Sequence, residues 1–464
     1  MDAPSPQHVA ARSLRWWVLA GLLIVLLAVA VQYTFKASDD RSAFVRWRNQ
    51  ILDLGQGVDI YQVHVYPNPP IMALILYPYA LLPELDLSQF DVDIGALAWF
   101  GTKVVMTIIA FLWTVQLVQS KEQPFPPWAQ AIVVLLALRP IIGDLSHGNV
   151  NLLIMFLVVA SLFAYQKGRD FLAGLVLGLA IACKVTPALF VPYFLWKRAW
   201  TTLAGCAVGL VLFLVLVPGL ILGFAENQQL LVSWYEKMVA PYASGAEVTT
   251  EHSNQSLPGL LYRLTTTSPS FLDERDLPAE YHNVVDLNPW VARRILQALG
   301  LGFLVLMAWS CRVPVSPRGG WRLAAEFSIV LLGMLLFSER TWKHHCVTLL
   351  VPLAVVCYYL ATHWSHTLVR WYLIATLVIA ELSMAATSTS LWEKVAGYRL
   401  GAKLAQVYGT YVWAYLLLLA ALVVLLALER RRVRREQSTP GKASALPWSF
   451  RPHFHTAGRI PSST

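Results

Sequence analysis

The sequence predicts an all-α, polytopic membrane protein, and three observations lead to this fold class. Of the 464 residues, 57% are hydrophobic and 14% are charged, and the mean hydropathy is +0.54. One soluble core cannot bury that much apolar surface. Apolar runs of about 20 residues, long enough to cross a hydrocarbon core, recur along most of the chain. Lys and Arg collect at the ends of these runs, as in the loops of membrane proteins.

The apolar runs predict about 10 to 13 transmembrane or re-entrant helices in an integral membrane domain of residues 1–436. Residues 71–83 are short for a crossing, so we interpret them as re-entrant or juxtamembrane. Residues 171–196 contain Lys184 and Pro187 in the middle, which predicts two half-spans separated by a break. The regular spans are expected near residues 15–35, 95–117, 127–141, 150–166, 200–222, 293–311, 321–338, 346–362, 369–388 and 408–428.

Basic residues in the short loops predict the sidedness of the chain in the inner (plasma) membrane. They place both termini in the cytoplasm, together with a tail at 437–464 whose turn formers and lack of periodicity predict disorder. The polar stretches then share the extracytoplasmic face, namely a first loop at 36–70, a large loop at 224–291, and residues 142–151 and 339–345. The basic residues assigned to the cytoplasm are Arg12, Arg15, Lys167, Arg169, Lys197, Arg198, Arg312, Arg318, Arg322, Arg430, Arg431, Arg432, Arg434 and Arg435.

Charge and cysteine usage exclude other classes of partner. The net charge of +9 comes from arginines at the ends of spans, so it predicts no nucleic-acid partner. Five cysteines in or beside apolar segments, with no CxxC spacing, predict buried thiols. The pair His344 and His345 lacks the HExxH spacing of a helical zinc site, so we predict no metal or other cofactor. We expect a monomer.

The first loop holds two adjacent acids, Asp39 and Asp40, before an amphipathic segment. The residues alone leave two interpretations of this pair. The carboxylates can be a solvated helix N-terminus, where the helix dipole stabilises negative charge, or functional groups held above a cavity between the spans. Apolar residues at helical spacing predict an interfacial helix after the pair. These residues are Phe44, Trp47, Ile51 and Leu54.

Five sequence blocks follow one another between residues 36 and 360. They are GVDIYQVHVYPNPPIMALILYPYALLP, GDLSHGNVNLLIMFL, KGRDFLAGLVLGLAIACKVTPALFVPYFLWKRAW, HSNQSLPGLLYRL and SERTWKHHCVTLLVP. In this order they resemble the membrane glycosyltransferases of family 87, and the NQS and WKHH blocks are the most specific. The resemblance implies the GT-C fold, with a catalytic acid in the first extracytoplasmic loop. It also implies an enzyme that moves a sugar, mannose by resemblance, from a polyprenyl-phosphate donor to a glycolipid or glycan acceptor.

The chain departs from the family pattern at two points. Family members show a single Asp followed about four positions later by an aromatic residue, whereas this chain has two acids. Asp40 with Phe44 fits that spacing better, and Asp39 remains an alternative. The usual Gly-Gln before the Asn is replaced by His147 and Gly148.

The implied transfer needs a base for the acceptor hydroxyl, and cations or N–H donors for the departing phosphate. Asp40 or Asp39 is the candidate base. Lys184 is a candidate phosphate ligand because ionisable residues inside apolar runs are costly and therefore usually functional. The other phosphate candidates are Arg340, Lys343, His344 and His345. The alternative for these residues is structural, as a snorkelling lysine and a basic interfacial belt.

A third group of polar residues is predicted to contact the sugar or the acceptor. Asn254, Gln255 and Ser256 carry hydrogen-bonding groups suited to sugar hydroxyls, and Arg263 is suited to anionic groups. Helix capping and loop packing are the structural alternatives for such residues. Asn149, Asn151 and Trp342 complete this group.

Two other function classes compete with the enzyme. A transporter or flippase for a lipid-linked sugar also has many spans and buried charges, but it usually shows matching broken helices in two halves. The sequence predicts no counterpart of the Lys184 break within residues 321–428. A structural assembly subunit ranks last, because it has no reason to gather acids, bases and amides on one face.

Overall fold

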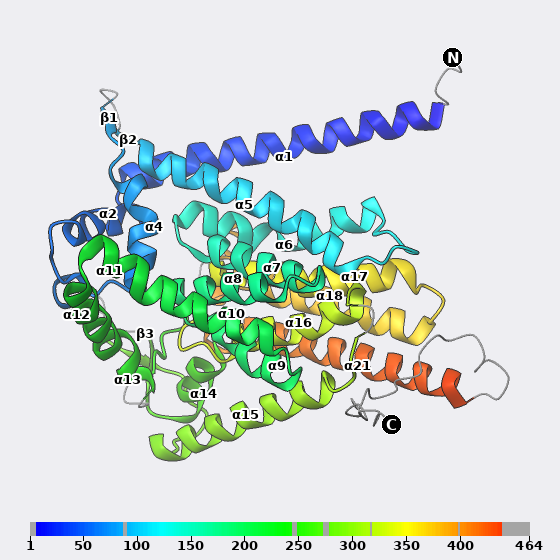
Figure 1. The fold of residues 1–464 in the computed structure, drawn as a ribbon. Helices are drawn as coiled ribbons and strands as arrows, with labels where there is room; N and C mark the ends of the chain where they lie inside the picture. Colours follow the sequence, from blue (N-terminus) through cyan, green and yellow to red (C-terminus); the bar gives the residue numbers. More distant parts are fainter. Residues whose placement is uncertain are drawn as a thin grey trace, which may run out of the picture.

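The computed structural model describes residues 6–86, 91–243, 248–271, 278–315, 318–397 and 400–438, and most of them are helical. The long helices form one bundle, and α1 (Pro6–Ser38) runs along its edge (Figure 1). Seven helices in the described residues are long and apolar enough to cross a membrane, and four shorter apolar helices accompany them. The protein is therefore an all-α, multi-pass membrane protein, and the predicted fold class is confirmed.

The long helices begin and end close to the predicted positions. Among them, α7, α16 and α17 are buried along most of their length, because they are apolar on all sides and other helices surround them. They form the core of the bundle. The helices at predicted regular spans are α5 (Ile94–Val118), α6 (Pro127–His147), α7 (Asn151–Gln166), α15 (Pro289–Ser310), α16 (Gly320–Leu336), α17 (Leu350–Thr362), α18 (Thr367–Ala385) and α21 (Thr410–Ser438).

The tightest helix crossing joins α8 (Asp170–Cys183) to α10 (Trp200–Leu210). Each helix presents two glycines four residues apart, a pattern that lets two backbones approach closely in membranes. A Cβ atom added at Gly174 would lie 1.9 Å from the carbonyl oxygen of Thr202. This crossing therefore requires glycine. Beyond it, α10 continues through the π-helical segment η2 (Val211–Leu216) into α11 (Val217–Leu222).

The predicted break at Lys184 is present. Helix α8 ends at Cys183, Lys184 is extended, and a short 3-10 segment, η1 (Thr186–Leu189), leads into α9 (Phe190–Trp196). A second 3-10 segment, η4 (Lys343–Leu349), begins the α17 span. It runs directly into α17, so it is the irregular start of one span and not a counterpart of the Lys184 break. Both segments turn the chain beside the same cavity, described below.

The first loop contains the predicted amphipathic helix, α2 (Ala43–Leu54), whose Phe44, Ile51 and Leu54 are buried. After the short α3 (Ile60–Val63), α4 (Pro70–Ala80) has 11 residues. Its rise of about 16 Å is half the hydrocarbon thickness, which agrees with an element that does not cross. A small hairpin that the sequence did not predict follows, with strands β1 (Glu84–Asp86) and β2 (Asp91–Asp93).

Arg48 connects α2 to this hairpin. Its guanidinium donates to the carbonyl oxygens of Ala80 and Leu82, and it pairs with Asp93 at 3.2 Å and with Glu84. A planar guanidinium with five donors can hold several chain ends at once. The contact holds α2 across the end of the bundle, next to the start of α5.

The remaining elements gather at the same end of the bundle as α2 (Figure 1). The large loop therefore lies near the first loop, as the sequence predicted. The segment before α21, which the sequence did not assign to this end, contacts the large loop, where Gln255 donates to the Gln406 carbonyl oxygen. The predicted tail lies outside the described residues from 439 onward. These elements are α12 (Phe224–Trp234), the π-helical η3 (Tyr235–Val239), α13 (Ala240–Ala243), α14 (Leu257–Thr265), β3 (Pro269–Phe271), β4 (Glu280–Tyr281), α19 (Thr389–Ala396) and α20 (Leu400–Val407).

Candidate functional site

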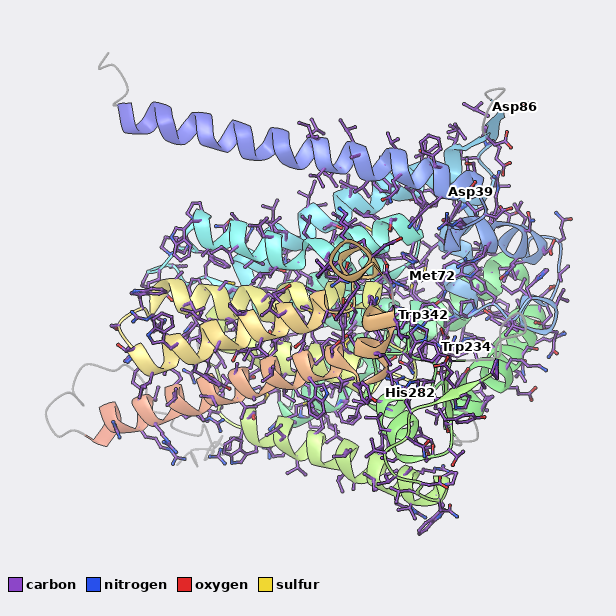
Figure 2. All side chains as sticks on the ribbon, turned by 180° about the vertical axis from the view of Figure 1, so that it is seen from behind. Asp39, Met72, Asp86, Trp234, His282 and Trp342 are labelled. Carbon is purple, nitrogen blue, oxygen red and sulfur yellow. The ribbon has the colours of Figure 1, made fainter. Side chains whose placement is uncertain are left out.

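Two neighbouring cavities lie at the end of the bundle where the polar loops meet. We name the first the Asp40 cavity, about 650 Å³, and the second the Lys184 cavity, about 690 Å³. Arg46 and Trp342 line both of them. Figure 2 shows Asp39, Trp342 and Trp234 at this same end. Two ligands bound in these cavities would meet beside Trp342.

Asp40 occupies the turn between α1 and α2, and its carboxylate is exposed to the Asp40 cavity. Its backbone is left-handed, with φ of 55°, a conformation that Asp and Asn tolerate better than most residues. Asp39 precedes it in the same turn, directly after α1 ends at Ser38. The Asp39 side chain is 63% exposed, lies 3.9 Å from Arg41, and lines none of the described cavities. The structure therefore distinguishes the two acids, because Asp40 lines a cavity and Asp39 does not, whereas the sequence left both as candidates.

A glycine brings the loop after α6 against this turn. Gly148 is left-handed, with φ of 65°, and a Cβ atom there would lie 2.3 Å from the hydroxyl oxygen of Ser42. Ser42 is buried and hydrogen-bonds to Tyr33 at 3.0 Å. His147, one residue before, lines the Asp40 cavity, and Asn149, one residue after, lines the Lys184 cavity. The close approach therefore explains why a glycine stands at 148, where the family pattern has glutamine.

Histidines from two distant segments meet beside Asp40. The rings of His147 and His344 stack with centroids 4.7 Å apart, and Asn149 Nδ2 lies 3.2 Å from His344 Nε2. His345 turns the other way, into the Lys184 cavity, while Trp342 stands between the two cavities. The 3-10 geometry of η4 explains this split, because consecutive residues point about 120° apart around its axis.

A buried network of charged and amide groups lies beneath the cavities. Lys103 Nζ donates to Asp144 Oδ1 at 3.3 Å and to the Asp144 carbonyl oxygen at 2.9 Å, and both side chains are fully buried. Asn151 Nδ2 donates to Asp144 Oδ2 at 2.9 Å. Asn151 Oδ1 in turn accepts from Lys184 Nζ at 2.6 Å. Both Asp144 oxygens are thus occupied, so Asp144 is suited to positioning and not to accepting a proton.

Lys184 presents the remaining donors of its ammonium group to the Lys184 cavity, because Asn151 accepts only one of three. Several further polar groups lining this cavity are buried and have no hydrogen-bond partner among the described residues. A buried polar atom without a partner costs about 1–3 kcal/mol, so such a group of atoms indicates a polar ligand. The atoms are Gln50 Oε1, Asn68 Nδ2, Trp234 Nε1, Arg340 Nε and Trp342 Nε1.

The two basic residues that flank Trp342 line different cavities. Arg340 lines the Lys184 cavity, donates to Thr249 Oγ1 at 2.8 Å, and lies over the Trp342 ring at 5.5 Å. Lys343 lines the Asp40 cavity and donates to the Thr387 carbonyl oxygen at 2.7 Å. The predicted phosphate ligands are therefore brought together around two adjoining spaces.

The NQS block lies behind these cavities. Asn254, Gln255 and Ser256 are fully buried, and they line neither cavity. Asn254 Nδ2 donates to the carbonyl oxygens of Thr249 and Glu339, and its Oδ1 accepts from the amides of Ser256 and Thr341. These bonds hold the large loop to the segment that carries Arg340 and Trp342. Sugar contact by the NQS residues stays a prediction.

Arg263 has a similar connecting position. Its guanidinium is buried and donates only to backbone carbonyl oxygens, including Val407 at 2.8 Å and Thr250 at 3.0 Å. Burial lowers the pKa of Arg263 to about 10. It therefore stays charged at neutral pH and holds the large loop against the end of α20. A contact with an anionic ligand stays a prediction for this residue too.

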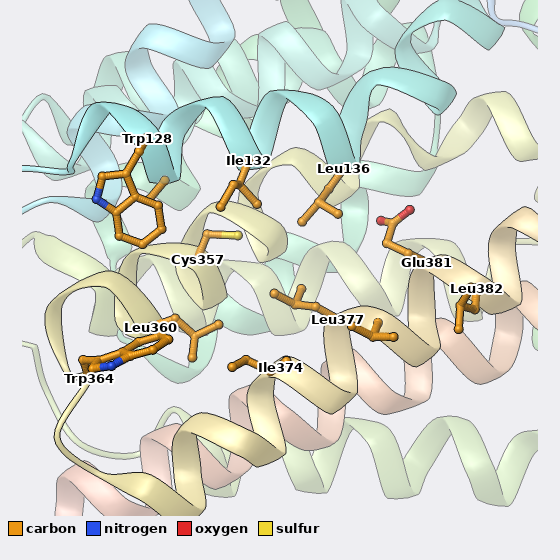
Figure 3. Close-up of a pocket in the computed structure, with 12 residues that line it drawn as sticks. Trp128, Ile132, Leu136, Cys357, Leu360, Trp364, Ile374, Leu377, Glu381 and Leu382 are labelled. Carbon is orange, nitrogen blue, oxygen red and sulfur yellow. The ribbon is translucent and has the colours of Figure 1, made fainter.

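An apolar groove of about 480 Å³ runs between α6, α17 and α18 toward the Asp40 cavity. Figure 3 shows Trp128 and Leu136 on α6 facing α18, with Glu381 at the end of the groove beyond Leu136. Farther along α6, Arg139 and His147 line the Asp40 cavity. Spacings of three and four residues place these α6 residues on one helix face. The same face thus lines an apolar channel and then a polar cavity.

The sequence analysis missed three basic or acidic residues of this site. Lys103 and Arg139 stand within apolar runs, so the rule that selected Lys184 applies to them as well. Asp144 stands in one of the five quoted blocks, three residues before His147. Its role depends on contacts with Lys103 and Asn151, which spacing along the chain does not reveal.

Three relatives of this chain are glycosyltransferases by name. The chain is 28% identical over 364 residues to the polyprenol-phosphate-mannose-dependent alpha-(1-2)-phosphatidylinositol mannoside mannosyltransferase of Mycolicibacterium smegmatis, covering 75% of this chain and 73% of that protein. It is 24% identical over 416 residues to the corresponding pentamannoside mannosyltransferase of the same organism, covering 85% of this chain and 89% of that protein. An alpha-(1->3)-arabinofuranosyltransferase of Corynebacterium glutamicum is 24% identical over 274 residues, which cover 56% of this chain and 60% of the relative.

The family model described as Glycosyltransferase family 87 matches residues 66–338, more than half of the chain. The match begins in the first loop and ends just before Arg340, so it includes Lys184, Asn149 and Trp234 of the Lys184 cavity but not the α2 residues or the segment from Arg340 to His345. The membrane-spanning helices and the polar cavities are consistent with this membrane glycosyltransferase family. The chain belongs to glycosyltransferase family 87.

Proposed function

We propose that this enzyme transfers mannose from a polyprenyl-phosphate donor to a phosphatidylinositol mannoside or a similar glycolipid, with Asp40 as the general base. The observation that carries the proposal is the pair of cavities that meet at Arg46 and Trp342, one lined by the Asp40 carboxylate and the other by the cations Lys184 and Arg340. The mannosyltransferases among the relatives support the donor and acceptor. The active site faces the extracytoplasmic side, because the predicted cytoplasmic arginines lie at the opposite end of the bundle.

The reaction breaks the bond between the sugar C1 and the phosphate oxygen, and it forms a bond between C1 and an acceptor hydroxyl oxygen. The hydroxyl proton passes to the Asp40 carboxylate, and polyprenyl phosphate leaves with one more negative charge. Asp40 is the one carboxylate among the described residues that line its cavity, and basic side chains surround it. Fixed cations stabilise the departing phosphate without a proton donor. The proposal therefore includes no metal and needs only a monomer.

The candidate phosphate ligands divide between the two cavities; the lysines and Arg340 supply positive charge, and the two histidines supply ring N–H donors. Lys184, Arg340 and His345 line the Lys184 cavity, where the aromatic rings of Trp47 and Trp234 offer apolar faces to a sugar. Lys343 and His344 line the Asp40 cavity. Asn149 borders the Lys184 cavity, and Asn151 accepts a hydrogen bond from Lys184. We assign the donor phosphate to the space around Trp342, within reach of both sets.

The first test is transfer of radiolabelled mannose by the purified protein in lipid, with polyprenyl-phosphate mannose as donor and phosphatidylinositol mannosides as acceptor. We expect a labelled glycolipid whose formation needs both substrates and persists in EDTA. A second arm uses polyprenyl-phosphate arabinose, because one relative is an arabinofuranosyltransferase. Transfer of arabinose alone would overturn the choice of mannose. Movement of intact donor across the bilayer without transfer would favour the flippase alternative.

Substitution of Lys184 by methionine should lower kcat/KM for the donor about 10- to 100-fold, because a charge-assisted hydrogen bond to the phosphate is lost. The measurement is the initial rate of mannose transfer at varied donor concentration. Lys237→Met is the matched control, since Lys237 is exposed at the same end and lines neither cavity. An equal loss in both variants would contradict a specific role for Lys184.

We assign the polyprenyl chain of the donor to the apolar groove, because the same face of α6 leads from the groove to the Asp40 cavity. Leu377→Trp should fill the groove and raise KM for a long-chain donor about tenfold or more, through lost burial of several methylene groups. A donor with a short prenyl chain should be affected much less. The control is Ile379→Trp, at an exposed position of α18 outside the groove. Equal KM changes for both chain lengths would exclude the groove as the chain site.

A further inference from the structure

A basic cavity of about 830 Å³ lies between α9, α15 and the start of α16. Four cations line it, namely Lys197, Arg198, Arg312 and Arg318, and its described lining contains no carboxylate. Leu195, Leu304 and Met307 form its apolar wall. The cavity thus combines a cationic rim with a hydrocarbon-like surface.

This cavity is separate from the catalytic end. Leu323, near the start of α16, lines the basic cavity, whereas Phe337, just past the end of the same helix, lines the Lys184 cavity. Fourteen residues of helix correspond to about 21 Å. A molecule in the basic cavity therefore lies most of a bilayer core away from Asp40 and Lys184, and it takes no part in the transfer proposed above.

Two of the four cations already have acidic partners. Lys197 pairs with Glu326 at 2.8 Å and donates to the Cys311 carbonyl oxygen at 2.8 Å. Arg318 pairs with Asp170 at 2.5 Å.

The other two cations have no acidic partner among the described residues. Arg198 is exposed at the rim, and Arg312 is exposed and lies over the Trp309 ring at 5.1 Å. The rim therefore carries positive charge that the described protein atoms do not neutralise.

The aromatic residues around the rim indicate its depth in the membrane. Trp196 and Trp309 are both exposed, and they stand at the ends of α9 and α15 beside Arg198 and Arg312. Exposed tryptophans next to arginines at helix ends are typical of the headgroup level of a bilayer. The apolar wall between the helices then lies at the level of the acyl chains.

We propose that the basic cavity binds one anionic phospholipid, with its phosphate between Arg198 and Arg312 and an acyl chain against Leu195, Leu304 and Met307. Basic pockets between membrane helices recognise lipid headgroups in this way. Positive charge that only sets topology needs no cavity and no apolar wall. The lipid would fill the space between α15 and α9 and hold α15 to the bundle.

The experiment measures phosphatidylglycerol binding to the purified full chain by native mass spectrometry and by thermal unfolding in detergent. Phosphatidylcholine with the same acyl chains and inorganic phosphate are the comparison ligands. We expect phosphatidylglycerol to bind at one site and to raise Tm, whereas neither comparison ligand does so. Equal effects of the two phospholipids would overturn the proposal. An equal effect of inorganic phosphate would replace the lipid by a free anion and would overturn it as well.

The variant Arg198→Gln/Arg312→Gln should weaken phosphatidylglycerol binding about 30-fold. Its matched control is Arg431→Gln/Arg434→Gln, which removes the same charge from exposed positions of α21 outside the cavity. Equal losses in both variants would show diffuse surface attraction and contradict the site. If the double variant does not fold, Arg312→Gln alone should weaken binding about fivefold.

Discussion

Replacing Asp40 with asparagine should lower kcat for mannose transfer about 10²- to 10⁴-fold, the contribution of a positioned general base. Asparagine cannot accept the hydroxyl proton, yet it tolerates the left-handed backbone at this position about as well as aspartate does. The variant should therefore fold normally and still bind the donor. The measurement is single-turnover transfer with saturating donor and acceptor, together with Tm in detergent.

The control for this result is Asp39→Asn, one residue earlier. Its carboxylate is 63% exposed and forms only a distant pair with Arg41 at 3.9 Å, so its loss should change activity less than about twofold. If Asp39→Asn were inactive and Asp40→Asn active, Asp39 would be the base. Full activity in both single variants would exclude a carboxylate base in this turn.

The second large effect is expected at Lys103, which lies beneath the cavities. Lys103→Met removes the charge partner of the fully buried Asp144, and removing one member of a buried ion pair costs about 3–5 kcal/mol of folding free energy. The midpoint of thermal unfolding in detergent should fall accordingly. Lys167→Met provides the comparison, because Lys167 is an exposed lysine at the end of α7 and its removal should have little effect.

A double variant separates stability from positioning in this network. Lys103→Met/Asp144→Asn leaves no buried charge, so it should regain most of the lost stability. Its transfer rate should nevertheless remain low, because an uncharged amide at 144 holds Asn151, and through it Lys184 at 2.6 Å, less firmly than the carboxylate does. Full recovery of both Tm and kcat would show that the pair only stabilises the fold.

The sequence could propose residues whose signal is local. It missed residues whose role depends on contacts with distant parts of the chain. The sequence proposed Lys184 and Asp40, which line the cavities, because a charge in an apolar run, and an acid before an interfacial helix, are local signals. Lys103 carries the same local signal as Lys184 but belongs to none of the five blocks. Asp144 acquires its role only by contacting Lys103, 41 positions earlier in the chain.

For the NQS block the sequence suggested a role, but it could not identify the partners of the side chains. Its amide and hydroxyl groups suit sugar recognition, and the sequence offers no means to tell a sugar hydroxyl from a backbone carbonyl as their partner. In the folded chain Asn254 is occupied by the Thr249 and Glu339 carbonyl oxygens and the Thr341 amide. Only the packing of the large loop against the segment before η4 decides this.

The sequence by itself determined that the chain lies in a membrane, which segments can span it, and which family the chain resembles. Apolar length fixes which segments can enter a bilayer, and the broken run at Lys184 follows from a charge and a proline within three residues. The tertiary structure decided which of the two exposed acids lines a cavity, because the left-handed turn at Asp40 places this residue, and not Asp39, beside the Asp40 cavity. It also decided how Lys103, Asp144, Asn151 and Lys184 connect, since hydrogen bonds between four different segments exist only once the helices pack.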